Sequence, residues 1–201
     1  MGSKQVFQPL TKEDKITVVL YRIGIVLSTV IIAGLAFFLK TASPASDTAT
    51  LGRSADILIY GLYAAVGMSV FFIHLYIRKF KGYLKNLYFI GIACLGVLLY
   101  IGKGSLTGAL EHTPSSSLLL LPLSLCLGFV TAKEAFCFKL FEGYLLAMIM
   151  PIYLLYISSS TLGSAGASSG LVLIAVMLVI FALRKVFMPL AYDIGDKSAY
   201  Q

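Results

Sequence analysis

Four charged residues lie between two long apolar runs of this chain, and they are Lys133, Glu134, Lys139 and Glu142. Lys139 and Glu142 are three residues apart, so they would be neighbours on a helix. We favour an interfacial loop or short helix here, with the charges in water and the nearby phenylalanines at headgroup depth. The alternative is a functional cluster in which Glu134 or Glu142 reaches between helices, because carboxylates at membrane depth are costly and tend to be functional.

A histidine is the second candidate for chemistry. His74 lies three residues before the end of the apolar run from Ile57 to Ile77. A neutral imidazole there would hydrogen-bond a neighbouring helix, ligate a haem or chlorophyll, or relay a proton. A single histidine without a partner favours the hydrogen bond. We therefore keep His74 as a weak cofactor-binding candidate, and as a member of the candidate cluster with Lys133, Glu134, Lys139 and Glu142.

Other catalytic and metal-binding patterns are absent from the sequence. It contains no His/Glu metal motif in the apolar runs, no P-loop and no dinucleotide fingerprint. The three cysteines, Cys94, Cys126 and Cys137, form no CxxC motif. We therefore expect no catalytic residues, no metal and no cofactor, and a protein that is not an enzyme.

The composition predicts the kind of structure that must position these residues. Hydrophobic residues make up 59% of the 201 residues and charged residues 12%, whereas soluble domains have about 25% charged residues. A soluble chain of this length needs a polar exterior that these residues cannot supply. Lipid tails tolerate an apolar exterior, so the composition predicts one helical membrane domain.

Six apolar runs are long enough to cross a hydrocarbon core of about 30 Å at about 1.5 Å per residue. They cover roughly residues 16–39, 57–77, 84–102, 115–132, 143–162 and 164–183. We predict an all-α polytopic transmembrane bundle over residues 16–187, with a polar N-terminal segment at 1–15 and a polar C-terminal tail at 188–201. A cleaved signal peptide is not expected, because the first run is too long and Lys40 follows it directly.

The positive charges predict the orientation of the bundle. With six spans and the N-terminus inside, all but three of the 16 Lys and Arg residues lie on one side, and the exceptions are Lys40, Arg53 and Lys103. This split follows the positive-inside rule. It predicts that both termini and the segments 78–86 and 133–142 face the cytoplasm or stroma. It also accounts for the net charge of +7 without nucleic acid as a partner.

Small residues recur at a spacing of four, at Gly24 and Ser28 and again at Gly61, Ala65 and Ser69. Such rows let helix backbones approach closely, so they predict a packed bundle.

Arg22 interrupts the first apolar run, and we expect it to snorkel to the interface rather than to pair with an acid in the bundle. The tail carries Asp193 and Asp196. It could dock on nearby cations, but a frayed terminus is the commoner case and is what we expect.

Three stretches carry a resemblance to a known family: Phe72-Ile-His-Leu-Tyr-Ile-Arg-Lys-Phe-Lys81, Lys133-Glu-Ala-Phe-Cys-Phe138 and Met188-Pro-Leu-Ala-Tyr-Asp-Ile-Gly-Asp-Lys197. They resemble a family of uncharacterised integral membrane proteins of cyanobacteria and plastids, classed as a domain of unknown function. The resemblance covers nearly the whole chain from about residue 15. It implies a photosynthetic organism and a plasma or thylakoid membrane, and it supplies no catalytic residues.

Three classes of function remain open. We favour a non-enzymatic accessory, scaffold or assembly protein for membrane complexes, with membrane lipids and other membrane proteins as its partners. The alternative is a small transporter or channel, for which the prolines Pro122 and Pro151 would break the helices. The second alternative is a haem- or pigment-binding membrane protein that uses His74.

Overall fold

The computed structural model describes residues 11–41, 48–75, 78–159 and 163–194, and all regular elements within these ranges are helices. In chain order they are α1 (Lys12–Thr41), α2 (Thr48–Phe72), α3 (Arg78–Ile101), α4 (Leu106–His112), the 3₁₀ helix η1 (Pro114–Leu120), α5 (Leu121–Phe138), α6 (Phe141–Ser158), α7 (Ser164–Val186) and α8 (Ala191–Ile194). Six spans in these ranges are long and apolar enough to cross a membrane, with η1 and α5 forming one of them. The predicted all-α transmembrane bundle is confirmed. The predicted polar segments at 1–15 and 188–201 lie partly outside the described residues.

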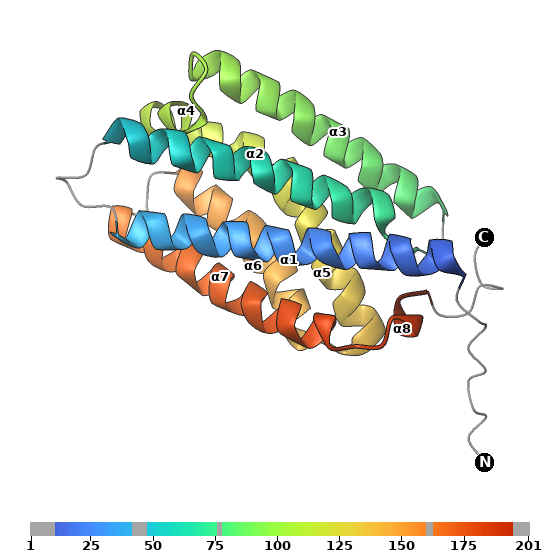
Figure 1. Cartoon of the computed structure of the whole chain (residues 1–201). Helices are drawn as coiled ribbons and strands as arrows, with labels where there is room; N and C mark the ends of the chain where they lie inside the picture. Colours follow the sequence, from blue (N-terminus) through green and yellow to red (C-terminus); the bar gives the residue numbers. More distant parts are fainter. Residues whose placement is uncertain (1–10, 42–47, 76–77, 160–162, 195–201) are drawn as a thin grey trace.

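The long helices run side by side, so the bundle has two ends (Figure 1). One end holds the start of α1, the turn between α5 and α6, the end of α7, and α8, and we call it the α8 end. The other holds the end of α1, the start of α2, and the short helices α4 and η1, and we call it the α4 end. Helix α1 packs against both α2 and α7, and α5 packs against α6.

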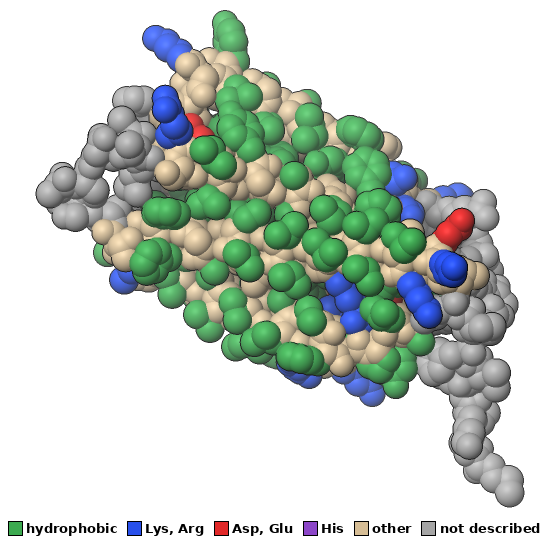
Figure 2. All heavy atoms as spheres, viewed as in Figure 1, with side chains coloured by type: hydrophobic (Ala, Val, Ile, Leu, Met, Phe, Trp, Pro, Cys, Tyr) green, Lys and Arg blue, Asp and Glu red, His purple; other side chains and the backbone are tan. Residues whose placement is uncertain are grey.

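The outer surface of the bundle is apolar. Val30, Phe37, Ile57 and Met148 are each more than 60% exposed. Figure 2 shows hydrophobic side chains spread over the middle of the visible face, with many Lys and Arg side chains toward the two ends. Such a surface is unfavourable in water but suits contact with lipid tails. The low charge content of the sequence therefore has a direct structural counterpart.

The helix bounds differ from the predicted spans, most of all at the α8 end. Helix α2 ends at Phe72, so His74 lies in the connection to α3 rather than within the second span. Helix α3 begins at Arg78 and α5 continues to Phe138. The segment 78–86 and most of 133–142, predicted as loops, are thus helical. Helical hydrogen bonds satisfy the backbone there, while long Lys side chains still reach polar surroundings.

The prolines do not act alike. The fourth span changes from 3₁₀ to α-helix at Leu121, and Pro122 occupies the first turn of α5, where its missing N–H leaves no hydrogen bond broken. Pro151 lies inside α6. At the other end of α5, Lys139 has a φ of 55° and ends the helix in the left-handed conformation. That turn allows α6 to begin two residues later.

Small residues bring helix backbones into close contact in the half of the bundle next to α8. A Cβ atom added at Gly24 of α1 would lie 2.7 Å from the Ala65 carbonyl oxygen and 2.8 Å from the Ser69 amide nitrogen of α2. A Cβ atom at Gly143 of α6 would lie 2.5 Å from the Thr131 carbonyl oxygen of α5. Neither seam can admit even a methyl group unless backbones move.

We predict that Gly24→Ala destabilises the bundle, because its methyl group would meet backbone atoms of α2 and force α1 away, at a cost of about 1–3 kcal/mol. Gly96→Ala in α3 is the matched control, since a Cβ there meets nothing within 4 Å. That change should leave stability unchanged or raise it by up to about 1 kcal/mol, the usual helix preference for Ala over Gly. Unfolding of the purified variants by SDS titration, followed by circular dichroism, compares the two. Equal stabilities would contradict the close seam.

Candidate functional site

Glu134 lies at the centre of a buried group of polar and charged side chains at the α8 end. Its Oε1 accepts hydrogen bonds from the Tyr21 hydroxyl at 2.7 Å and from Lys133 Nζ at 2.6 Å. Its Oε2 pairs with Lys185 Nζ. Glu134 and Lys185 are fully buried. Glu134 therefore reaches between the helices, and the favoured interpretation of an interfacial loop is wrong for this residue.

Asp193 of α8 joins the same group from the other side. Its Oδ1 pairs with Lys185 Nζ. Its Oδ2 accepts from Arg22 Nε at 2.8 Å and from the terminal Nη2 at 2.5 Å. Helix α8 is thereby held against α1 and α7, and the expectation of a frayed tail is wrong as far as Ile194. We call the set Tyr21, Arg22, Lys133, Glu134, Lys185 and Asp193 the ion-pair network.

Arg22 does not snorkel to the interface as expected. Besides its two bonds to Asp193, the guanidinium donates to the backbone carbonyls of Val186, Met188 and Pro189, at 3.2, 2.6 and 3.1 Å. These five bonds match the five N–H donors of an arginine side chain. The reason for the difference is the turn after α7, whose carbonyl groups lie within hydrogen-bonding distance of the guanidinium on α1. Arg22 satisfies them and the carboxylate together.

The ion-pair network contains three cations, Arg22, Lys133 and Lys185, and two carboxylates. The formal net charge of the network is therefore +1. Charges removed from water are costly unless they are paired and hydrogen-bonded. The Lys185 ammonium also lies 4.1 Å from the centre of the Phe138 ring, which adds a favourable cation–π contact. The described residues contain no group of three His, Cys, Asp or Glu side chains that could hold a metal ion.

The other members of the predicted cluster lie elsewhere. Glu142 accepts two hydrogen bonds from Arg184 at 2.8 Å each, and Arg184 is about half exposed. Lys139 forms the turn between α5 and α6. The structure thus brings Lys133 and Glu134 together and leaves Lys139 and Glu142 outside the network.

His74 lies at the same end of the bundle. Its Nε2 is 3.2 Å from the Thr17 hydroxyl of α1, as the favoured interpretation of an interhelical hydrogen bond requires. The pKa of His74 is lowered, first because the ring is largely removed from water, and then because the cations Lys81 and Lys133 lie nearby. Asp193 and Asp14 act in the opposite direction but do not reverse the shift. The neutral imidazole is therefore favoured.

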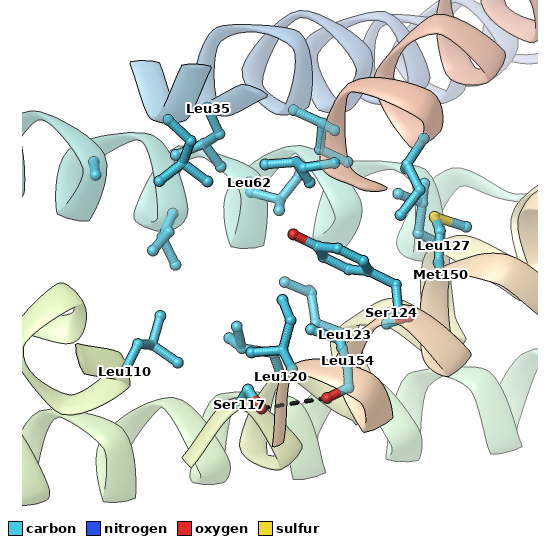
Figure 3. Close-up of a pocket in the computed structure, with 18 of the residues that line it drawn as sticks. Leu35, Leu62, Leu110, Ser117, Leu120, Leu123, Ser124, Leu127, Met150 and Leu154 are labelled. Carbon is cyan, nitrogen blue, oxygen red and sulfur yellow. Dashed lines mark hydrogen bonds between the residues drawn. The ribbon is translucent and has the colours of Figure 1, made fainter. Parts of the chain in front are cut away.

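The half of the bundle nearer α4 holds a different feature, an apolar cavity of about 340 Å³. Leucines from seven elements line it, and Figure 3 shows Leu35 of α1, Leu62 of α2, Leu110 of α4, Leu120 of η1 and Leu154 of α6 among those around the open space. Toward the α8 end the lining reaches Ile32 of α1, Leu127 of α5 and Ile174 of α7, and on α2 it reaches Val66. The cavity thus extends from the α4 end to about the middle of most spans, and further along α2.

Four lining residues carry hydroxyl groups, and three of those groups are bonded to protein. Ser117 donates to the Leu154 carbonyl at 3.3 Å (Figure 3), Tyr153 to that of Ala167 at 2.8 Å, and Thr107 to that of Gly52 at 3.4 Å. The fourth is Ser124, whose buried Oγ has no partner among the described residues. The cavity therefore offers very little polar surface, which suits an apolar occupant and repels ions.

Asp56 of α2 holds one wall of the cavity in place. Its carboxylate accepts from the backbone N–H groups of Thr107 at 2.8 Å and Leu106 at 3.2 Å, at the start of α4. The Ser105 hydroxyl donates to it at 3.1 Å. A carboxylate at a helix N-terminus satisfies amides that have no helical partner. Helix α4, which contributes Thr107 and Leu110 to the cavity wall, is thereby tied to α2.

Sequence reasoning missed Tyr21, Lys185, Asp193 and Asp56 as parts of these sites. Arg22 and Lys185 did carry a signal, since each places a cation inside or against an apolar run. Opposite charges in Asp193 and Glu134 were available as partners. The sequence pattern did not identify which charged residues pair with one another, because most of the paired residues are more than forty positions apart in the chain. The cavity had no sequence signal.

Comparison with known proteins gives a family but no activity. The family described as "Uncharacterized integral membrane protein (DUF2301)" matches residues 68–201, more than half of the chain. A protein of Haemophilus influenzae, named only as uncharacterized, is 25% identical over 203 residues, covering 100% of this chain and 99% of that protein. No solved structure matches. The expected family is confirmed, whereas a restriction to cyanobacteria and plastids is not.

We predict that Glu134→Gln lowers stability by about 3 kcal/mol or more, because it leaves the Lys133 ammonium without a carboxylate and the buried Lys185 with Asp193 alone. Glu142→Gln is the matched control: it removes a carboxylate from a partly exposed ion pair and should cost at most about 1 kcal/mol. SDS titration of both variants measures the difference. Similar losses would contradict the energetic importance of the ion-pair network.

We predict that stability falls on acidification more steeply in the wild type than in His74→Gln. The folded protein favours neutral His74, whereas the unfolded chain binds a proton near the ordinary pKa of 6.5. The unfolded state therefore gains protons as the pH drops below about 6.5, and this loss of stability ends once the pH passes below the lowered pKa of the folded state. Glutamine can keep the bond to Thr17 without titrating. Midpoints measured at pH 7.5 and 5.5 test this, and equal pH dependences would contradict it.

Proposed function

This chain belongs to the DUF2301 family of uncharacterised integral membrane proteins, and we propose that it is a non-enzymatic accessory protein that holds an apolar, chain-like molecule of the bilayer. The observation that carries the proposal is the cavity of about 340 Å³ between α1, α2, η1, α5, α6 and α7. Its volume falls in the range of about 300–1,000 Å³ typical of small-molecule sites.

The cavity is partly open to its surroundings and its wall is almost wholly apolar, so contact with water is unfavourable there and an apolar occupant is favoured. Water is a poor filler, because a buried water needs two to four polar partners and three of the four hydroxyl-bearing side chains on the wall are already bonded to protein. An alkyl or isoprenoid chain fits the wall better, since it requires no hydrogen bonds.

The setting also favours a molecule from the membrane. The outer surface of the bundle is apolar, and α4 and η1, which line the cavity, lie at the α4 end of the bundle (Figure 1). We propose membrane lipids as the direct partners. Other membrane proteins are the partners we propose for the accessory role, with the occupant held in the bundle for their use.

The membrane and the orientation belong to the same proposal. We infer a plasma or thylakoid membrane, with the α8 end toward the cytoplasm or stroma. The split of Lys and Arg residues supports this orientation, because the cations gather at the ends of the spans next to α8.

A small transporter is the second candidate, and one observation favours it. The cavity reaches from the α4 end to about the middle of most spans, while the opposite half of the bundle is closed by the close helix seams and the ion-pair network. A binding space open toward one side and shut toward the other is the arrangement expected of one state of alternating access. Haem or pigment binding is less favoured, because His74 Nε2 already bonds Thr17.

We predict that the wild-type protein, loaded with deuterated dodecane and exchanged into fresh nanodiscs, retains about one molecule per chain, as one site of this volume implies. Leu62→Trp should retain much less, because the larger ring fills the cavity from α2. Leu173→Trp is the control, since Leu173 of α7 is 52% exposed on the outer surface. Mass spectrometry counts the retained dodecane. Equal retention in both variants would contradict the cavity as the site.

A further inference from the structure

The cavity and the ion-pair network lie on the same helices, one beyond the other. On α5, Leu127 at the bottom of the cavity and Glu134 are seven residues apart, about 10 Å along the helix axis. On α1, Ile32 and Arg22 are ten residues apart, about 15 Å. The ion-pair network therefore lies directly between the bottom of the cavity and the α8 end.

A layer of buried apolar side chains separates the two. Ile25 of α1, Val130 of α5, and Leu178 and Phe181 of α7 are all less than 5% exposed. The side chains named here are joined to one another by packing contacts alone, without a covalent bond or a hydrogen bond between them. Its closure therefore depends on what fixes α1, α5 and α7 to one another at the α8 end.

The strongest polar links across these helices are those of the ion-pair network. Tyr21 joins α1 to α5 through Glu134, Lys185 joins α7 to α5, and Asp193 joins α8 to both α1 and α7. The close glycine contacts, in contrast, lock α1 to α2 and α5 to α6. At the α8 end the seams between these pairs therefore carry ion pairs in addition to the packing of α7 against α1 and α6, whereas the seams within the pairs rest on close packing.

From this arrangement we propose that the ion-pair network is the closed gate of a passage that continues the cavity, and that Asp193 on α8 is its latch. The proposal rests on the proposed function, since the passage would release the apolar molecule toward the α8 end. Removing Asp193 takes away the carboxylate that lies between Arg22 and Lys185, so that Arg22 has no acidic partner among the described residues and Lys185 has only Glu134, while the two cations still repel each other. Water entering the seam could solvate both, whereas a seam made of apolar side chains has no such second state.

The alternative is a network that only fastens the C-terminal turn. The gate hypothesis predicts that the apolar layer around Val130 opens, whereas the alternative predicts that it stays closed. The test uses the full chain in nanodiscs with its three cysteines replaced by serine or alanine and Val130→Cys as reporter. A membrane-impermeant maleimide added in solution then measures access to this buried position, and retained deuterated dodecane measures whether the cavity is intact.

We expect Asp193→Asn to raise the labelling rate of the reporter by about tenfold or more, as loss of one partner from a buried ion pair implies. Glu142→Gln, which alters a partly exposed ion pair outside the network, should leave the rate unchanged. The same rate in Asp193→Asn, Glu142→Gln and the parent would overturn the gate while leaving the binding proposal standing. Loss of dodecane binding in the parent itself would instead count against the proposed function.

A second variant keeps the test decisive if Asp193→Asn does not fold. Arg22→Met with Asp193→Leu replaces the latch by an apolar contact, a type of exchange that is often neutral or stabilising. We expect this pair to retain dodecane and to label more slowly than the parent, because the apolar seam has no hydrated open state. Labelling as fast as in the parent would overturn the gate.

Discussion

Five ionised side chains that must satisfy one another away from water constrain the whole α8 end of the bundle. Glu134 and Lys185 are shielded from solvent. Arg22 donates all five of its N–H groups to Asp193 and to carbonyl groups of the turn after α7. Each of these groups is acceptable only while the others are present. The positions of α1, α5, α7 and α8 relative to one another follow from that mutual requirement.

The rest of the bundle is organised around this fixed end. Small residues at Gly24 and Gly143 allow the helices to meet backbone to backbone on the same side of the membrane as the ion-pair network. Toward the α4 end larger leucines face inward, and the helices surround open space instead of meeting. The bundle is therefore asymmetric, with close backbone seams and the ion-pair network toward α8 and the cavity toward α4.

The sequence predicted the membrane spans of this structure better than the contacts between their side chains. Apolar run lengths and charge distribution were enough for six spans, because the bilayer imposes both. The row from Gly24 and the row with Ala65 and Ser69 were recognised, and they do meet. For Arg22 we predicted a snorkelling side chain, and for the tail that carries Asp193 a frayed terminus, because these are the commoner cases. Their pairing depends on the turn after α7, whose carbonyl positions cannot be read from residue types. The cavity arises from how the helices diverge, which no local pattern encodes.

The place of Asp193 near the end of the chain has a consequence for biogenesis. During synthesis α1 enters the membrane with Arg22, and α5 enters later with Glu134, long before α8 has left the ribosome. The set of charges becomes complete only when the last described helix arrives. Until then Arg22 and Lys185 lack one of the acceptors that the folded bundle gives them. The arrival of α8 and the closure of the ion-pair network are thereby coupled through a single carboxylate.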